Sequence, residues 1–143
     1  YHSNRFMTHF IASRARKVSG FFQYQKENDF WDGSRTSLNI RPNIKWSQNL
    51  SFNAGFRLDN VKLPGGEFSS KVGNIEINFN LTNSWLTKTT VQYDNIQDEV
   101  GVNFRLNWIY QPGDDFFLVY NQEGSSGQTD RAIIIKFTRS FDF

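Results

Sequence analysis

The chain has 143 residues, enough for one domain, and contains no run of about 20 apolar residues, which excludes a transmembrane helix. It has no cysteine, which excludes disulfides and thiolate metal sites. The formal net charge is only +2, and the 16 basic residues are scattered among 14 acidic ones, so no basic run indicates a nucleic-acid partner.

Most of the chain alternates between apolar and polar residues with a period of two, which is the period of a β-strand. The expected strands, in chain order, are residues 6–12, 18–24, 36–46, 50–59, 67–81, 85–94, 102–110, 116–120 and 133–143. Pro42 falls inside the third of them. Because proline has no N–H for a ladder, we expect a bulge or an edge position there.

The connections between these strands fall into two groups. The short ones are residues 13–16, 47–49, 82–84 and 112–114, and the longer ones are residues 26–33, 60–66, 94–99 and 122–130. Short turns on one rim and longer loops on the other are typical of outer-membrane β-barrels, whose short rim faces the periplasm. In the turn at residues 111–114, Pro112 presets φ and Gly113 is expected to take a positive φ.

The predicted fold is therefore all-β, an antiparallel transmembrane β-barrel of outer-membrane type. Roughly nine strands is an odd number, whereas such barrels have an even number of strands and begin and end at the periplasmic rim. The chain also starts at Tyr1, with neither a methionine nor a visible signal peptide. We therefore expect residues 1–143 to be the C-terminal part of a larger barrel, completed by upstream strands or a partner chain.

A soluble β-barrel such as a lipocalin, with the apolar face inward, is the alternative. Against it, the apolar faces begin or end in tryptophan or tyrosine, which favour the membrane–water interface. The candidate interface aromatics are Trp46, Trp85, Tyr93, Trp108, Tyr110 and Tyr120. Phe137, Phe141 and Phe143 are expected to form the signal for the outer-membrane assembly machinery. The expected partners are that machinery and the lipid and lipopolysaccharide of the cell outer membrane.

The polar faces carry the candidate functional residues. The candidates for lining a barrel lumen are Arg41, Lys45, Arg57, Glu76, Lys88, Asn103, Arg105 and Asn107. Charged residues in a lumen set solute preference, so a pore for small polar solutes is favoured. A barrel that anchors or assembles an envelope complex is the alternative, because large barrels are often plugged.

Enzymatic chemistry has little support in the sequence. The only histidines are His2 and His9, and an outer-membrane hydrolase built on His9 is a third, weaker hypothesis. The carboxylates Asp59, Glu76 and Asp94 could form a paired acid site, but ion pairs with neighbouring cations explain them better. Two histidines without cysteine predict no metal site, and no cofactor is expected.

Four segments carry a family resemblance: residues 63–68 (LPGGEF), 91–93 (VQY), 103–115 (NFRLNWIYQPGDD) and 117–121 (FLVYN). Their order and spacing resemble a family of bacterial outer-membrane proteins. In that family a periplasmic carbohydrate-binding-like domain precedes a large C-terminal barrel of undefined function. The resemblance implies a large upstream portion. The sugar-binding-like domain lies outside this chain, so no carbohydrate site is expected here.

Overall fold

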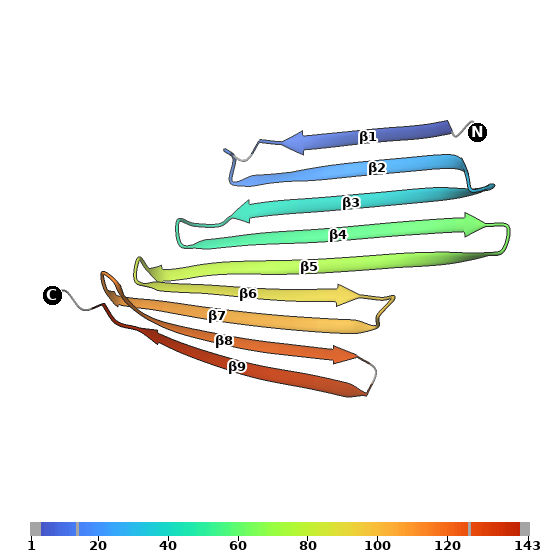
Figure 1. The fold of residues 1–143 in the computed structure, drawn as a ribbon. Coiled ribbons are helices and arrows are strands. Elements are labelled where there is room, and N and C mark those ends of the chain that lie inside the picture. The colour runs from blue at the N-terminus through green and yellow to red at the C-terminus, as the bar shows by residue number, and fades with distance from the viewer. Residues whose placement is uncertain (1–3, 14, 126, 141–143) are drawn as a thin grey trace.

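The computed structural model describes residues 4–13, 15–125 and 127–140, and these residues form nine antiparallel β-strands in a single sheet. The strands are β1 (Asn4–Ala12), β2 (Val18–Phe30), β3 (Gly33–Lys45), β4 (Leu50–Leu63), β5 (Gly66–Thr82), β6 (Trp85–Asp94), β7 (Glu99–Gln111), β8 (Asp114–Ser125) and β9 (Gln128–Thr138). Each strand pairs with the next along the chain, which places β1 and β9 at the two edges (Figure 1). The predictions of an all-β fold and of nine antiparallel strands are confirmed.

Within the described part of the chain, no helix has the length and apolar character needed to cross a membrane.

The register of the sheet gathers apolar side chains on one face, called the apolar face below. Cross-strand partners such as Leu38 and Leu58, or Phe104 and Tyr120, repeat from strand to strand because side chains alternate between faces. Its main members are Phe10, Phe22, Leu38, Ile40, Phe52, Phe56, Ile75, Ile77, Val91, Phe104, Leu106, Leu118, Tyr120, Ile133 and Ile135.

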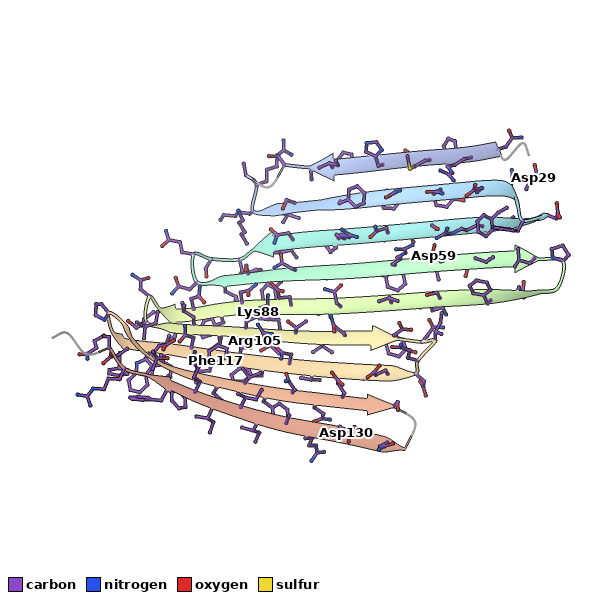
Figure 2. All side chains as sticks on the ribbon, in the orientation of Figure 1. Asp29, Asp59, Lys88, Arg105, Phe117 and Asp130 are labelled. Carbon is purple, nitrogen blue, oxygen red and sulfur yellow. The ribbon has the colours of Figure 1, made fainter. Side chains whose placement is uncertain are left out.

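The opposite side, called the polar face below, carries amides and charges with a few apolar exceptions. Its main members are Gln23, Asn39, Asn43, Asn53, Arg57, Asp59, Asn74, Glu76, Lys88, Asn103, Arg105 and Asn121. Figure 2 shows side chains standing on both sides of the single layer of strands. The two faces extend across the whole sheet, from edge to edge.

The apolar face does not pack into a core. Among the described residues, Val61 and Val119 are the buried hydrophobic ones, and both lie on the polar face. On the apolar face, Ile135 is 64 % exposed and Phe137 is 61 % exposed. A soluble barrel would enclose this face as its hydrophobic core. The described strands do not form such a core.

The predicted alternation of short and long connections is wrong. Strands β2 and β3 are joined by Trp31 and Asp32 alone, and β4 and β5 by Pro64 and Gly65. Strand β8 runs to Ser125 and β9 starts at Gln128, whereas residues 95–98 between β6 and β7 agree with the predicted loop. Conversely, residues 13–17 and 46–49 form connections longer than those three.

Two physical reasons explain the missed strand ends. Residues 60–63 were missed because residues 59–62 and their partners 67–70 are mostly polar on both faces and show no hydrophobic alternation, yet their backbone ladder continues. The β2–β3 hairpin turns through positive φ angles of 51° at Trp31 and 60° at Asp32. That geometry suits a two-residue hairpin, but asparagine-glycine is its usual sequence signal, and this turn lacks it.

The prediction that Pro42 marks a bulge or an edge is also wrong. Strand β3 lies inside the sheet, between β2 and β4. The pairs Ile40–Phe56 and Asn43–Asn53 on either side of the proline keep the same register, and Pro42 lies opposite Gly20 of β2. A Cβ on Gly20 would lie 2.9 Å from the Arg41 carbonyl oxygen, so glycine permits the close approach of β2 at this point.

Candidate functional site

The structure places all eight candidate lumen residues on the polar face. They come from five strands: Arg41 and Lys45 from β3, Arg57 from β4, Glu76 from β5, Lys88 from β6, and Asn103, Arg105 and Asn107 from β7. Lys88 and Arg105 are direct cross-strand partners, and Figure 2 labels them close together, with Asp59 towards the other end of the strands. The candidates are therefore spread over one face of the sheet, and several of them contact one another across strands.

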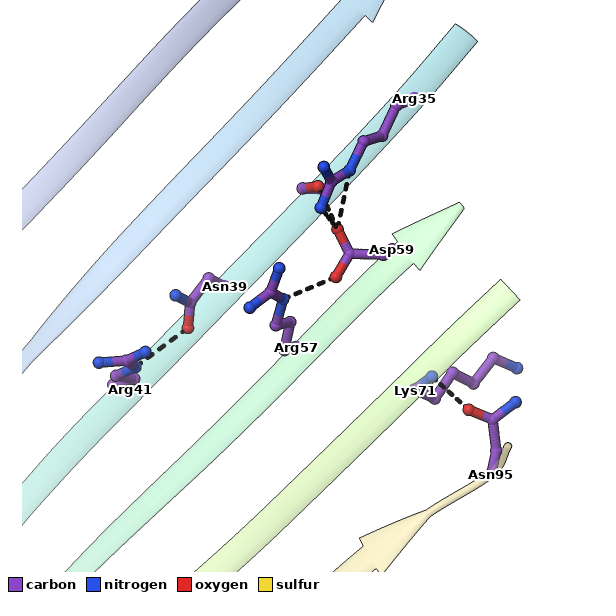
Figure 3. A network of polar contacts seen from close by, with 8 residues as sticks. Arg35, Asn39, Arg41, Arg57, Asp59, Lys71 and Asn95 are labelled. Carbon is purple, nitrogen blue, oxygen red and sulfur yellow. Dashed lines mark hydrogen bonds and ion pairs between the residues drawn. The ribbon is translucent and has the colours of Figure 1, made fainter. Parts of the chain in front are cut away.

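Asp59 is the centre of one cluster on this face (Figure 3). Its carboxylate lies 2.8 Å from Nη2 of Arg35 and 2.6 Å from Nε of Arg57, and the Ser37 hydroxyl donates to it. The Asp59 side chain is 11 % exposed, because its cationic partners cover it. Sequence reasoning found Asp59 and Arg57 but missed Arg35, which precedes the predicted start of its strand.

Glu76 is the centre of a second cluster. Its carboxylate lies 2.6 Å from Nζ of Lys88 and accepts hydrogen bonds from Nδ2 of Asn53 at 3.1 Å and of Asn78 at 2.9 Å. The Asn43 amide donates in turn to Asn53. A polar chain therefore crosses from β3 to β6, and it holds the long charged side chains in defined positions.

A third group lies on β7 and β8. Nε of Arg105 donates to Oδ1 of Asn103 at 3.0 Å, and the Asn103 amide donates to Asn121. These residues, together with Lys88 and Glu123, line part of a hollow of about 380 Å³. Oδ1 of Asn107 is buried nearby in the same strand, without a hydrogen-bond partner among the described residues.

The carboxylates do not form a paired acid site. Asp59 and Glu76 each bind a cation, and Asp94 accepts the Ile96 N–H at 2.8 Å, which closes the turn after β6. His9 lies on the polar face opposite Gln23, while His2 lies outside the described residues. Across the described ranges, no three His, Asp or Glu side chains are grouped so that they could hold a metal ion.

Four aromatic rings line one end of the apolar face. Trp85 and Trp108 stack at 4.9 Å between ring centroids, Trp108 and Tyr110 lie at 5.7 Å, and Tyr110 and Phe137 stack at 5.8 Å. This aromatic row lies next to the turns at residues 83–84 and 112–113.

The other predicted aromatics are dispersed. Trp46 follows β3 and is 73 % exposed, Tyr93 lies at the opposite end of β6, and Tyr120 lies in the middle of β8, between Phe104 and Ile133. Phe141 and Phe143, which were predicted to form the assembly signal with Phe137, lie outside the described residues.

Asp114 ties the β7–β8 turn to the segment that follows β9. Its side chain is buried and accepts the Ser140 N–H at 2.6 Å, the Ser140 hydroxyl at 3.1 Å and the Tyr110 hydroxyl at 3.1 Å, with a further bond from Gln111. Gly113 has a φ of 88°, which confirms the predicted turn geometry. The donors, foremost the Ser140 backbone N–H, lower the pKa of Asp114 from 3.8 to about 2.

Because this pKa is lower in the folded state, the stabilisation by Asp114 is fully present above pH 4 and is lost as the pH falls through about 2. We expect the Ser140 amide to lose protection over that range, measured as its exchange rate relative to the intrinsic rate at each pH, and Asp114→Asn to lower its protection at neutral pH. Amide hydrogen exchange measured by mass spectrometry checks this. Asp115→Asn, one residue along the same turn, is the matched control, and an equal effect there would contradict the assignment.

Comparisons with family models, curated proteins and solved structures gave no match for this chain. The described residues define an amphipathic antiparallel β-sheet. The polar face carries side chains joined by hydrogen bonds and ion pairs, and the apolar face is exposed.

Proposed function

We propose that this chain forms part of the wall of an outer-membrane β-barrel whose lumen passes small polar solutes. One observation carries the proposal: across nine strands the large apolar side chains gather on one face, which packs against no other element of the described residues, while the opposite face carries hydrogen-bonded amides and charges. Exposing one large apolar side chain to water costs about 1.5–3 kcal/mol relative to burying it, so a face of this size needs an apolar environment. Lipid acyl chains supply it.

The distribution of buried residues supports an inward polar face. Within the described ranges, five of the six buried residues, Ser19, Glu27, Asp59, Val61 and Val119, lie on the polar face, and the sixth, Asp114, lies at the β7–β8 turn. Side chains crowd one another on the concave side of a curved sheet and spread apart on its convex side. The polar face is therefore assigned to the lumen and the apolar face to lipid.

Strand lengths and aromatic rings support a position across the bilayer. A transmembrane strand needs about 9–11 residues, and β5 has 17. The β4–β5 hairpin therefore projects beyond the hydrocarbon core, with its polar residues 59–62 and 67–71 in water. The row of Trp85, Trp108, Tyr110 and Phe137 at the other end suits headgroup level on the periplasmic side.

A transport role is favoured over an anchoring role because the polar face is lined by cations, carboxylates and amides from many strands, as a wet lumen is. Anchoring of an envelope complex is the second candidate, and the resemblance to barrels with a periplasmic carbohydrate-binding-like domain favours it. An outer-membrane hydrolase is the third, and it requires that His9→Ala abolishes activity.

Two measurements on the full-length protein test the proposal. In vesicles of brominated phospholipid, the fluorescence of Trp85 and Trp108 is expected to be quenched, because both lie on the apolar face. In a planar bilayer, the protein is expected to give discrete open steps. Unquenched fluorescence contradicts the membrane assignment, and a quenched but silent barrel contradicts transport and leaves anchoring.

Charge reversal on the polar face is expected to change ion preference. Arg105→Glu places an anion beside the hollow. The water-screened interaction of this anion with a passing ion is about 1 kcal/mol, which corresponds to roughly a fivefold rise in the cation-to-anion permeability ratio. Reversal potentials under a salt gradient measure it. Lys62→Glu makes the same change of charge on the β4–β5 hairpin, on the side of the apolar face, and is expected to leave the ratio unchanged.

A further inference from the structure

Two hollows of the polar face meet at Gly101. The hollow of about 380 Å³ described above contains Lys88 and Arg105, and a second hollow of about 290 Å³ extends to the turn after β6. Gln92, Gly101 and Glu123 line both. Gly101 lies between Gln92 and Glu123, and a Cβ built on it would meet no atom within 4 Å among the described residues. Because Gly101 has no side chain, the hollows are joined, and together they are called the Gly101 groove below.

Opposite charges lie at opposite ends of the Gly101 groove. At one end, Lys88 and Arg105 are cross-strand partners on β6 and β7. At the other end, Glu99 and Glu123 add two carboxylates. Figure 2 labels both cations towards one end of the strands and Asp130 towards the other. Asp130 is the cross-strand partner of Glu123, so it extends the acidic end.

These charges differ in whether they have partners. Lys88 pairs with Glu76 at 2.6 Å, whereas Nε of Arg105 donates to a neutral amide oxygen. Within the part of the chain that the structure describes, Arg105, Glu99 and Glu123 take part in no ion pair. A ligand in the groove therefore finds a cation at one end and carboxylates at the other.

Uncharged polar side chains line the groove between its ends. Gln92, Asn103 and Asn121 contribute amides, and Thr90 contributes a hydroxyl. These groups both donate and accept hydrogen bonds, which suits the alternating N–H and C=O groups of a peptide backbone. A neutral sugar would also bond to them, but it would leave the charges at both ends without partners.

The length of the groove selects among zwitterions. Gly101, which lies opposite Glu123, is four residues from Arg105 along β7, or about 13 Å at the rise of a strand. A free amino acid is too short to reach both ends, whereas an extended peptide of three or four residues spans about 10–14 Å.

We propose that the Gly101 groove binds short zwitterionic peptides, with the terminal carboxylate on Arg105 and the terminal ammonium at Glu123. This inference rests on the proposed function and names the class of its solute.

Isothermal titration calorimetry with trialanine, on the full-length protein in detergent micelles, tests the proposal. An ionic strength of about 10 mM keeps the screening length near 30 Å. Trialanine is expected to bind saturably. N-acetyl-trialanine lacks the ammonium and trialanine amide lacks the carboxylate, so each is expected to bind about fivefold more weakly, the loss of one water-screened ion pair. Free alanine is expected to bind no more tightly than these two.

Two substitutions assign the termini. Glu123→Gln is expected to weaken trialanine about fivefold and to leave N-acetyl-trialanine unchanged, because that peptide has no ammonium to lose a partner. Arg105→Gln is expected to weaken trialanine equally and to leave trialanine amide unchanged. Equal weakening of both peptides by either variant contradicts the assigned contact.

Filling the groove tests its shape. Gly101→Leu places a side chain in the open space without a clash and is expected to abolish trialanine binding. Gly65→Leu is the matched control at the β4–β5 turn, where an added Cβ likewise meets no atom within 4 Å among the described residues, and it is expected to leave the affinity unchanged.

Four results overturn the proposal. They are no saturable binding of trialanine, equal affinity for its acetylated or amidated form, full affinity in Gly101→Leu, and binding of maltose in place of trialanine. Planar-bilayer recordings on the same protein keep the two proposals apart. Open steps without peptide binding refute the peptide groove alone, whereas charge-dependent peptide binding to a silent barrel refutes transport alone.

Discussion

Phe104→Arg is expected to destabilise the inserted barrel by about 2–4 kcal/mol, the cost of a cation near the bilayer midplane on the lipid-facing side of a barrel strand. Phe104 lies in the middle of β7 on the apolar face, between Thr89 of β6 and Tyr120 of β8. Neither cross-strand neighbour carries a carboxylate that could pair with a guanidinium. Urea unfolding from lipid vesicles, followed by tryptophan fluorescence, measures the difference in unfolding free energy.

The matched variant is Asn103→Arg, one residue earlier in the same strand and on the other face. It removes the bonds of Asn103 with Asn121 and Arg105, at a cost of about 1 kcal/mol, but leaves the new cation in water. The proposed orientation therefore predicts that two neighbouring residues differ severalfold in their tolerance of arginine. Equal costs would contradict the assignment of the faces, and a larger cost at position 103 would reverse it.

Asp59→Asn is expected to destabilise the sheet by about 2 kcal/mol. The substitution leaves the guanidinium groups of Arg35 and Arg57 on adjacent strands without the carboxylate that lies between them. Hydrogen bonds between charged groups are worth about 1.5–3 kcal/mol each, and the lower value applies because Arg57 is 57 % exposed and water screens it. The same urea unfolding assay measures the loss.

A double-mutant cycle provides the control for Asp59. Once Arg35 is replaced by glutamine, Asp59→Asn is expected to cost less, since one of the two cations is already gone. Additive costs would show that Asp59 and Arg35 do not interact. Ser37→Ala, which removes a neutral donor to the same carboxylate, is expected to cost less than Asp59→Asn.

The sequence located the parts of the fold that depend on local alternation. The central parts of β4, β6 and β7 were predicted closely, because each alternates apolar and polar residues over most of its length. Arg105 and Phe104 were assigned to opposite faces on the same ground. The prediction failed where alternation stops, at residues 60–66 and 122–130, since hydrogen bonding between strands continues there without any pattern in the side chains.

The candidate site was only partly predictable. The sequence placed Arg57, Asp59 and Glu76 on one face, but it could not name their partners among several nearby charges. Arg35 binds Asp59 across 24 residues of sequence, and Lys88 binds Glu76 only because β5 and β6 pair in one particular register. A shift of that register by two residues keeps every side chain on its face and changes every pair.

What the sequence by itself determined is which side chains share a face, because in an extended strand that depends only on whether a residue number is odd or even. The tertiary structure alone decided which strands pair, where they end, and which polar groups meet. Asp114 and Ser140 are 26 residues apart and Pro42 faces Gly20, and no local pattern contains either fact. The reason is physical: a side chain's direction follows from its own backbone, whereas a ladder bond requires two distant segments to align.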